Sequence, residues 1–307
     1  MLFSVSVSSR QNAVMLISEI SKTITNSLQP LYDAREAAAI AKYYLEERLH
    51  CQAYELALRG GEVFPASLQL QFAEDLEKLK TGCPLQYVLG TAEFYGRKFD
   101  VSPATLIPRP ETEELVMRVV NECLDAEFPV SHPIIWDVGT GSGCIAITLA
   151  LEIPDATVFA TDISAEALAV ARCNAEKLGA KVVFAQHDMR DVTQLPFGNQ
   201  RFDYIVSNPP YIPASVREQM HANVREFEPA TALFVPDERP LIFYEALADL
   251  STVVLKPGGY CHCETYDDFH ETLTDMFLHK GFSAVESFLD LNDRPRGICA
   301  VKNGQEH

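Results

Sequence analysis

Apolar side chains recur along the chain with two different spacings, and the change from one to the other comes near residue 80. Residues 35–49 and 67–79 place apolar positions three and four residues apart, which is the spacing of one helix face. Gly60, Gly61 and Pro65 interrupt this pattern. Residues 1–80 are therefore predicted to form a small helical bundle. Its charges are interspersed without a catalytic pattern, so we expect it to dock a substrate.

The next segment, residues 81–109, has glycine and proline breaks between short β-branched and aromatic runs. This composition predicts a hairpin-like connector. Pro110 then begins a run with glutamate in its first turn. Proline at the first helical position and acidic residues beside it are typical of a helix N-terminus.

From residue 110 to residue 307, apolar runs of strand length alternate with amphipathic runs of helix length. The predicted strands are residues 134–138, 157–162, 181–188, 202–208, 258–264, 282–289 and 297–302. The predicted helices between them are residues 144–152, 164–179, 241–255 and 269–281. This alternation predicts a doubly wound α/β domain with a mostly parallel seven-stranded sheet covered on both faces. The two late strands suggest one antiparallel member.

Composition narrows the classes of protein. The chain has 307 residues, of which 47% are apolar, and no apolar run reaches the ~18 residues of a membrane span. Its start lacks a basic leader, so we interpret it as an extended terminus and not as a signal peptide. The 8 cysteines form no C-x-x-C pair, which favours buried free thiols and a cytoplasmic location. Cys261, His262 and Cys263 alternate faces on a strand, so we expect no metal site there.

Charge argues against nucleic acid as a direct partner. Lys and Arg total 25 against 43 for Asp and Glu, a formal net charge of −18. Proteins that bind nucleic acid normally present a basic stripe to the phosphates, and no local run supplies one.

The strongest motif is a glycine-rich loop between a predicted strand and helix, with glycine at positions 139, 141 and 143. Glycines let the main chain approach a ligand, and the following helix offers free N–H groups. A dinucleotide loop would need its third glycine at position 144, where Cys144 stands. The pattern therefore favours a nucleoside without a pyrophosphate.

Two further strand ends fit the same ligand. Asp162 ends the next strand, where a carboxylate can accept hydrogen bonds from both hydroxyls of a ribose. The alternative is that Asp162 only caps the following helix. Asp188 and Met189 end the third strand and could face an adenine ring. Together these residues indicate S-adenosylmethionine.

The acceptor motif is Asn208-Pro209-Pro210-Tyr211 at the end of the fourth strand. Asn-Pro alone is a common turn, but this one lies beside the expected cofactor. The Asn208 side-chain oxygen and the Pro209 carbonyl offer two acceptors to one NH₂ group, and Tyr211 offers a flat face. The side-chain NH₂ of Asn208 is expected to donate toward the cofactor or the nearby main chain. Methyl transfer needs mostly placement of the nitrogen, so the motif predicts an amino or amide methyltransferase.

Four segments in this order resemble one known family. They are IPRPETE (107–113), DVGTGSG (137–143), SNPPYI (207–212) and FEPATAL (227–233). The resemblance, which spans roughly residues 80–302, is to the protein-(glutamine-N5) methyltransferases that modify class 1 peptide chain release factors. It implies cofactor contacts by Gly139, Thr140, Gly141, Ser142, Gly143, Asp162, Met189 and Asn208. It also implies that Asn208, Pro209, Pro210 and Tyr211 grip the glutamine amide of the Gly-Gly-Gln loop, with Asn208, Pro209 and Tyr211 as the catalytic set.

Two departures from this family are visible. Met189 stands where an aromatic residue is frequent, and Thr265-Tyr266 follow Glu264 where the family usually has His or Gly.

The alternative function is an adenine-N6 methyltransferase acting on DNA or RNA, which shares the acceptor motif. A third alternative is a non-catalytic adaptor. An assay with labelled cofactor and either a release factor or DNA as the acceptor distinguishes these three functions.

Overall fold

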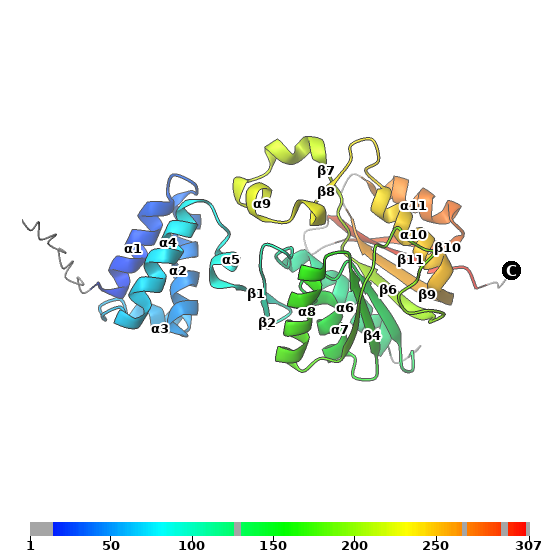
Figure 1. Cartoon of the computed structure of the whole chain (residues 1–307), viewed down its shortest axis with the longest axis horizontal. Coiled ribbons are helices and arrows are strands. Elements are labelled where there is room, and N and C mark those ends of the chain that lie inside the picture. Colours follow the sequence, from blue (N-terminus) through cyan, green and yellow to red (C-terminus); the bar gives the residue numbers. More distant parts are fainter. Residues whose placement is uncertain (1–14, 126–129, 266–268, 290–293, 305–307) are drawn as a thin grey trace, which may run out of the picture. The chain divides into compact units, whose positions relative to one another are not determined.

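The chain divides into two compact units, Met1–Leu89 and Gly90–His307. The computed structural model (Figure 1) describes residues 15–125, 130–265, 269–289 and 294–304. The expected extended terminus and Tyr266 lie outside the described residues. Within them, none of the helices is long and apolar enough to cross a membrane.

The N-terminal unit is helical because apolar faces of its helices meet in one core. Its elements are α1 (Ile17–Leu28), α2 (Ala34–Leu49), α3 (Ala53–Leu58), a 3-10 turn η1 (Ala66–Leu68), α4 (Gln69–Lys80) and α5 (Leu85–Leu89). Asp75 of α4 is fully buried and accepts hydrogen bonds from Tyr44 and Arg48 of α2 at 3.0 and 2.7 Å. This buried polar link fixes α2 against α4.

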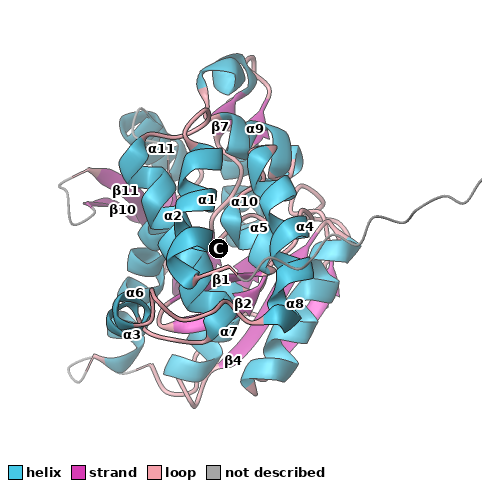
Figure 2. Cartoon of the chain, turned by 90° about the vertical axis from the view of Figure 1, so that its left-hand side faces the viewer, coloured by secondary structure: helices cyan, strands magenta, loops and turns pink. Residues whose placement is uncertain are grey.

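The segment predicted as a connector begins with α5 and continues as a hairpin. Strands β1 (Thr91–Phe94) and β2 (Arg97–Asp100), magenta in Figure 2, pair antiparallel. The turn between them has φ of 51° at Tyr95 and 69° at Gly96. Two left-handed residues match the twist that a two-residue hairpin needs. The helix predicted at Pro110 is α6 (Pro110–Leu124), with proline in its first turn.

The second unit contains the predicted seven-stranded sheet, in the order β10-β11-β9-β6-β3-β4-β5. The strands are β3 (Ile134–Val138), β4 (Thr157–Asp162), β5 (Val182–Gln186), β6 (Phe202–Ser207), β9 (Leu255–Glu264), β10 (Phe282–Leu289) and β11 (Pro295–Lys302). Only β11 among these runs opposite to the others, because it pairs antiparallel with both β9 and β10. The α/β fold with one antiparallel member is confirmed.

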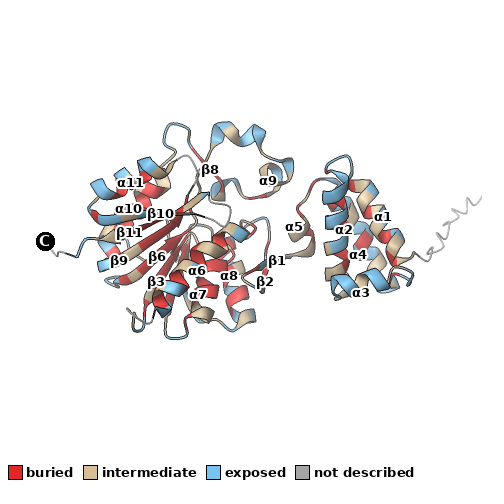
Figure 3. Cartoon of the chain, turned by 180° about the vertical axis from the view of Figure 1, so that it is seen from behind, coloured by how far each residue is buried: buried red, intermediate tan, exposed pale blue. Residues whose placement is uncertain are grey.

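Helices cover both faces of this sheet, and the red strands of Figure 3 show how deeply it is buried. One core packs α6, α7 (Cys144–Glu152) and α8 (Ala165–Leu178) against the sheet. The other packs α10 (Ile242–Val254) and α11 (His270–His279) against the opposite face. Neighbouring side chains of β3 alternate between them: Ile135 joins the first core and Trp136 the second.

An insertion between β6 and α10 was not predicted. It contains β7 (Ile212–Pro213), η2 (Ala214–Gln219), α9 (Ala222–Phe227), η3 (Ala230–Ala232) and β8 (Phe234–Val235). Each piece is too short to show a hydrophobic period.

The cysteine prediction is partly wrong. All eight cysteines are free, but Cys173 is exposed, and Cys51 and Cys83 are half-buried. Cys173 lies on α8, where its neighbour Asn174 is the residue that turns inward.

Candidate active site

A cavity of about 320 Å³ lies where the carboxyl ends of β3, β4 and β6 meet. Such strand ends are the usual ligand site of doubly wound sheets. Of the predicted site residues it is lined by Gly139, Thr140, Gly141, Ser142, Asp162, Asp188, Met189, Asn208 and Pro210. Gly143, Pro209 and Tyr211 lie outside this lining. The structure therefore brings most of the predicted cofactor residues to one cavity, together with Thr112 and Arg109, which sequence reasoning gave no role.

Asp137, the last polar residue of β3, holds the glycine loop in place. Its carboxylate is fully buried and accepts hydrogen bonds from the Thr140 hydroxyl (2.6 Å) and the Ala146 N–H (3.1 Å). Burial raises the pKa of Asp137 to about 7, although these two donors oppose the change. Asp137 thus fixes the shape of the glycine loop through its hydrogen bonds with Thr140 and Ala146.

Gly143, the third glycine, serves packing. Its φ is 83°, and an added Cβ would lie 2.8 Å from Ile147 Cδ1 and 3.1 Å from Ala171 Cβ. Its place under the loop explains why it stays outside the cavity lining.

Asp162 links the glycine loop to the residue that caps α8, and its ribose role stays a prediction. One carboxylate oxygen accepts from the Ser164 N–H at 2.9 Å, at the start of α8. The other accepts from the Gly141 N–H of the glycine loop, also at 2.9 Å. A carboxylate has about four acceptor positions, so both oxygens keep capacity for a diol. Burial raises the pKa of Asp162.

Asp188 and Met189, which follow β5, have different surroundings in the cavity. Met189 is 8% exposed, and its Cε lies 3.7 Å from the Cβ position of Gly139. Asp188 is held by Arg190, with the shortest contact at 2.6 Å, and this hydrogen bonding lowers the pKa of Asp188. Its carboxylate therefore already has a cationic partner.

Asn208 donates through Nδ2 to the hydroxyl of Thr112 at 3.1 Å. One of the two NH₂ hydrogens is thus donated to a side chain of α6, a partner that the sequence did not predict, and donation of the other toward the cofactor stays a prediction. Thr112 in turn donates to Glu264 at 2.6 Å, and the Tyr211 hydroxyl donates to the same carboxylate at 3.1 Å. Burial raises the pKa of Glu264, against the two donors.

A second carboxylate joins two segments of the family resemblance. Glu228, which is 5% exposed, accepts from the Ile107 N–H at 3.2 Å and from Arg109 at 2.5 Å. It therefore ties the insertion after β6 to the chain that precedes α6, beside the cavity.

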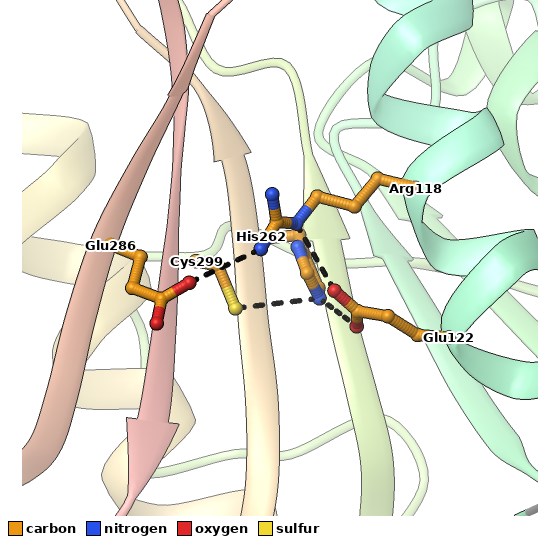
Figure 4. A network of polar contacts seen from close by, with 5 residues as sticks. All are labelled: Arg118, Glu122, His262, Glu286 and Cys299. Atoms are coloured by element: carbon orange, nitrogen blue, oxygen red, sulfur yellow. Dashed lines mark hydrogen bonds and ion pairs between the residues drawn. The ribbon is translucent and has the colours of Figure 1, made fainter. Parts of the chain in front are cut away.

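Among the described residues, one cluster brings a histidine, a cysteine and a carboxylate together, and His262 belongs to it. Figure 4 shows His262 pointing from β9 toward Glu122 of α6, with Cys299 on the neighbouring strand. Nε2 lies 2.9 Å from Glu122 and 3.7 Å from Cys299 Sγ. Burial alone would lower the pKa of His262, but Cys299 and Glu122 outweigh it and raise the pKa to about 9. Because Arg118 also binds Glu122, at 3.1 Å, we interpret this cluster as a buried ion pair that fixes α6 on the sheet.

The residues around the cavity fit S-adenosylmethionine. A Cβ at Gly141 would meet no protein atom within 4 Å, so the main chain there is open to a ligand. His187 lines the cavity, and its buried Nε2 has no hydrogen-bond partner in the described part of the chain. Asp162 supplies acceptors and Met189 an apolar wall, which suits a nucleoside without phosphates.

Comparison with known proteins shows which families the chain is similar to. Residues 131–287 match the family described as methyltransferase domain, and residues 19–90 match the one described as PrmC N-terminal domain. A release factor glutamine methyltransferase of Bacteroides thetaiotaomicron is 38% identical over 284 residues, covering 92% of this chain and 99% of that protein. One of Neisseria gonorrhoeae is 41% identical over 237 residues, covering 77% and 83%. The hMettl16 catalytic domain, solved with the MAT2A 3′UTR hairpin 1, shares the fold at a TM-score of 0.55 and 16% identity, covering 86% of this chain and 90% of that chain.

Proposed function

The chain belongs to the release factor glutamine methyltransferases, and from this premise we propose that it methylates the glutamine of the Gly-Gly-Gln loop in class 1 release factors. The methyl group comes from S-adenosylmethionine and goes to the side-chain amide nitrogen. The adenine-N6 alternative is not favoured, since the relatives are protein methyltransferases and the net charge is −18. Because its substrate is a translation factor, we propose that the enzyme acts in the cytoplasm.

The observation that carries the proposal is the arrangement of acceptors at the end of β6. Asn208 lines the cavity with its NH₂ turned to Thr112, which leaves its side-chain oxygen for a substrate. We propose that this oxygen and the Pro209 carbonyl hold the glutamine NH₂. An amide nitrogen is a weak nucleophile because its lone pair is delocalised. Two acceptors fix its position and stabilise positive charge as it develops there.

The cofactor contributes an activated methyl group on a sulfonium, and the chain's residues hold and orient it. We propose that Gly139, Thr140, Gly141, Ser142 and Asp162 hold its amino acid and ribose parts, and that Met189 packs on the adenine. Tyr211 lies outside the cavity lining and donates to Glu264, so we propose that it braces the acceptor motif.

We further propose that the N-terminal unit docks the release factor. Large apolar side chains are exposed on it, with Leu58 at 84%, Leu70 at 74% and Tyr54 at 69%. Such side chains can bury apolar surface when a protein partner covers them. Leu58→Ser should lower kcat/KM for intact release factor several-fold while leaving kcat/KM for a short Gly-Gly-Gln peptide unchanged. Leu278→Ser on α11, 45% exposed, is the matched control. Equal loss on both substrates would argue against docking.

The function itself is tested with purified enzyme, labelled S-adenosylmethionine and one of three acceptors. These are a class 1 release factor, the same factor with its Gly-Gly-Gln glutamine changed to alanine, and duplex DNA. Label should enter only the first, on the glutamine nitrogen as located by mass spectrometry. Label in the alanine variant or in DNA would refute the proposed substrate.

A further inference from the structure

A buried carboxylate lies behind the acceptor motif, although the sequence left its strand end without a role. Glu264 ends β9 and is 4% exposed. It accepts from the Thr112 hydroxyl at 2.6 Å and from the Tyr211 hydroxyl at 3.1 Å. Thr112, itself 2% exposed, then accepts from Asn208 Nδ2 at 3.1 Å. Three elements far apart in sequence thus form one chain of hydrogen bonds that ends at the proposed catalytic amide.

This chain has a fixed direction. A carboxylate can only accept hydrogen bonds, and a threonine hydroxyl has a single hydrogen to donate. Because Thr112 gives that hydrogen to Glu264, its oxygen can only accept from Asn208. The end of the Asn208 amide facing Thr112 must therefore be the NH₂. The carbonyl oxygen is left to the cavity.

We infer that Thr112 and Glu264 are positioning residues that set the polarity of the Asn208 amide and so select a substrate amide over a carboxylate. This inference rests on the proposed function and adds the origin of its specificity. Turning the Asn208 amide over would bring its oxygen against the Thr112 oxygen, whose hydrogen is already committed. It would also present NH₂ to the substrate NH₂, two donors with no acceptor between them.

The consequence for selectivity is specific to the reacting group. Glutamine presents an NH₂, whereas glutamate of the same shape presents only acceptors. An Asn208 oxygen held toward the cavity therefore favours glutamine. If the amide could turn freely, part of that preference would disappear. A purely structural role for Thr112 would not change the preference between two substrates of equal shape.

The cleanest test uses Thr112, because Glu264 also holds Tyr211. Thr112→Val keeps the shape and removes the hydroxyl, and Thr112→Ser restores the hydroxyl. Thr148→Val is the matched control, since the Thr148 hydroxyl on α7 is buried and has no hydrogen-bond partner in the described part of the chain. Glu264→Gln is a second variant that can donate to Thr112 and so permits the reversed chain.

Two readouts are measured on full-length enzyme. The first is kcat for release factor at saturating cofactor. The second is the ratio of dissociation constants for release factor and for its Gln→Glu variant, both with S-adenosylhomocysteine bound. Thr112→Val should lower kcat roughly tenfold or more and reduce the preference for glutamine by a similar factor. Glu264→Gln should also reduce the preference. Thr112→Ser should recover both quantities, and Thr148→Val should match wild type.

An unchanged preference in Thr112→Val, whatever its kcat, overturns the inference. So does a serine variant as impaired as the valine variant, since the hydroxyl would then be irrelevant. Failure of the proposed function is a separate result: wild-type enzyme would then not methylate the glutamine at all.

Discussion

Replacing Asp162 by alanine separates its ligand role from its role in the fold. The structure gives the carboxylate two main-chain partners, the Gly141 and Ser164 N–H groups, each at 2.9 Å. Loss of these bonds should lower the free energy of unfolding by about 1–3 kcal/mol. Loss of the proposed ribose contacts should cost another ~1.5–3 kcal/mol of binding, the range for hydrogen bonds to a charged group. The dissociation constant for S-adenosylmethionine should therefore rise roughly 10- to 150-fold.

The matched control is Asp33→Ala in the N-terminal unit. Asp33 likewise accepts from two main-chain N–H groups, those of Arg35 and Glu36, both at 2.8 Å. This variant should lose comparable stability without any change in cofactor affinity. Calorimetric titration gives the affinities and urea denaturation gives the stabilities. If Asp162→Ala lost stability but bound cofactor within twofold of wild type, Asp162 would be a helix cap and the ribose assignment would be wrong.

Three other outcomes follow from the geometry. Asn208→Ala should lower single-turnover methylation of release factor about 10²–10³-fold at saturating cofactor, with a smaller loss of cofactor affinity; a rate within a few-fold of wild type would reduce the motif to a turn. Gly143→Ala should destabilise the protein by about 2–4 kcal/mol in urea, because its Cβ meets packed side chains at a φ of 83°, whereas Gly179→Ala, with φ of 72° and open space, should cost about 1 kcal/mol. The pKa of His262, raised from 6.5 to about 9, gives stability that is complete below about pH 6.5 and is lost as pH rises through about 9. Glu122→Gln should flatten this pH dependence in the same denaturation assay, and an unaltered slope would contradict the ion pair.

Much of the sheet could be predicted from the sequence because its central strands, β3 and β6, are buried on both faces. Strands β3 (Ile134–Val138) and β4 (Thr157–Asp162) have the predicted bounds, and so does helix α7 (Cys144–Glu152) between them. Continuous apolar runs between glycine or proline breaks leave few alternatives. The insertion after β6 was missed because β7 and β8 have two residues each. Two residues cannot show an alternating pattern.

The site was predictable only where its residues are neighbours in sequence. The glycine loop and the acceptor motif are each continuous, and their chemistry can be read from residue types. The partners of Asn208 could not be found in this way. Thr112 lies 96 residues before it, and the Thr112 hydrogen bond to Glu264 spans 152 residues. A glutamate that ends an apolar strand was the available signal, but only the residues after it, Thr265-Tyr266, were noted, as a departure from a family pattern.

These sequence separations also determine when the parts of the site become available during synthesis of the chain. The glycine loop and Asp162 follow or end consecutive strands, β3 and β4, so these two parts of the cofactor site are synthesised close together. The acceptor half must wait for β9, whose last residue is Glu264. Because a domain folds as a unit, neither half is expected to be stable before β9, β10 and β11 have joined the sheet. A chain cut short ahead of residue 264 lacks β10, β11 and much of the second core, so it is expected to lose cofactor binding together with activity toward release factors.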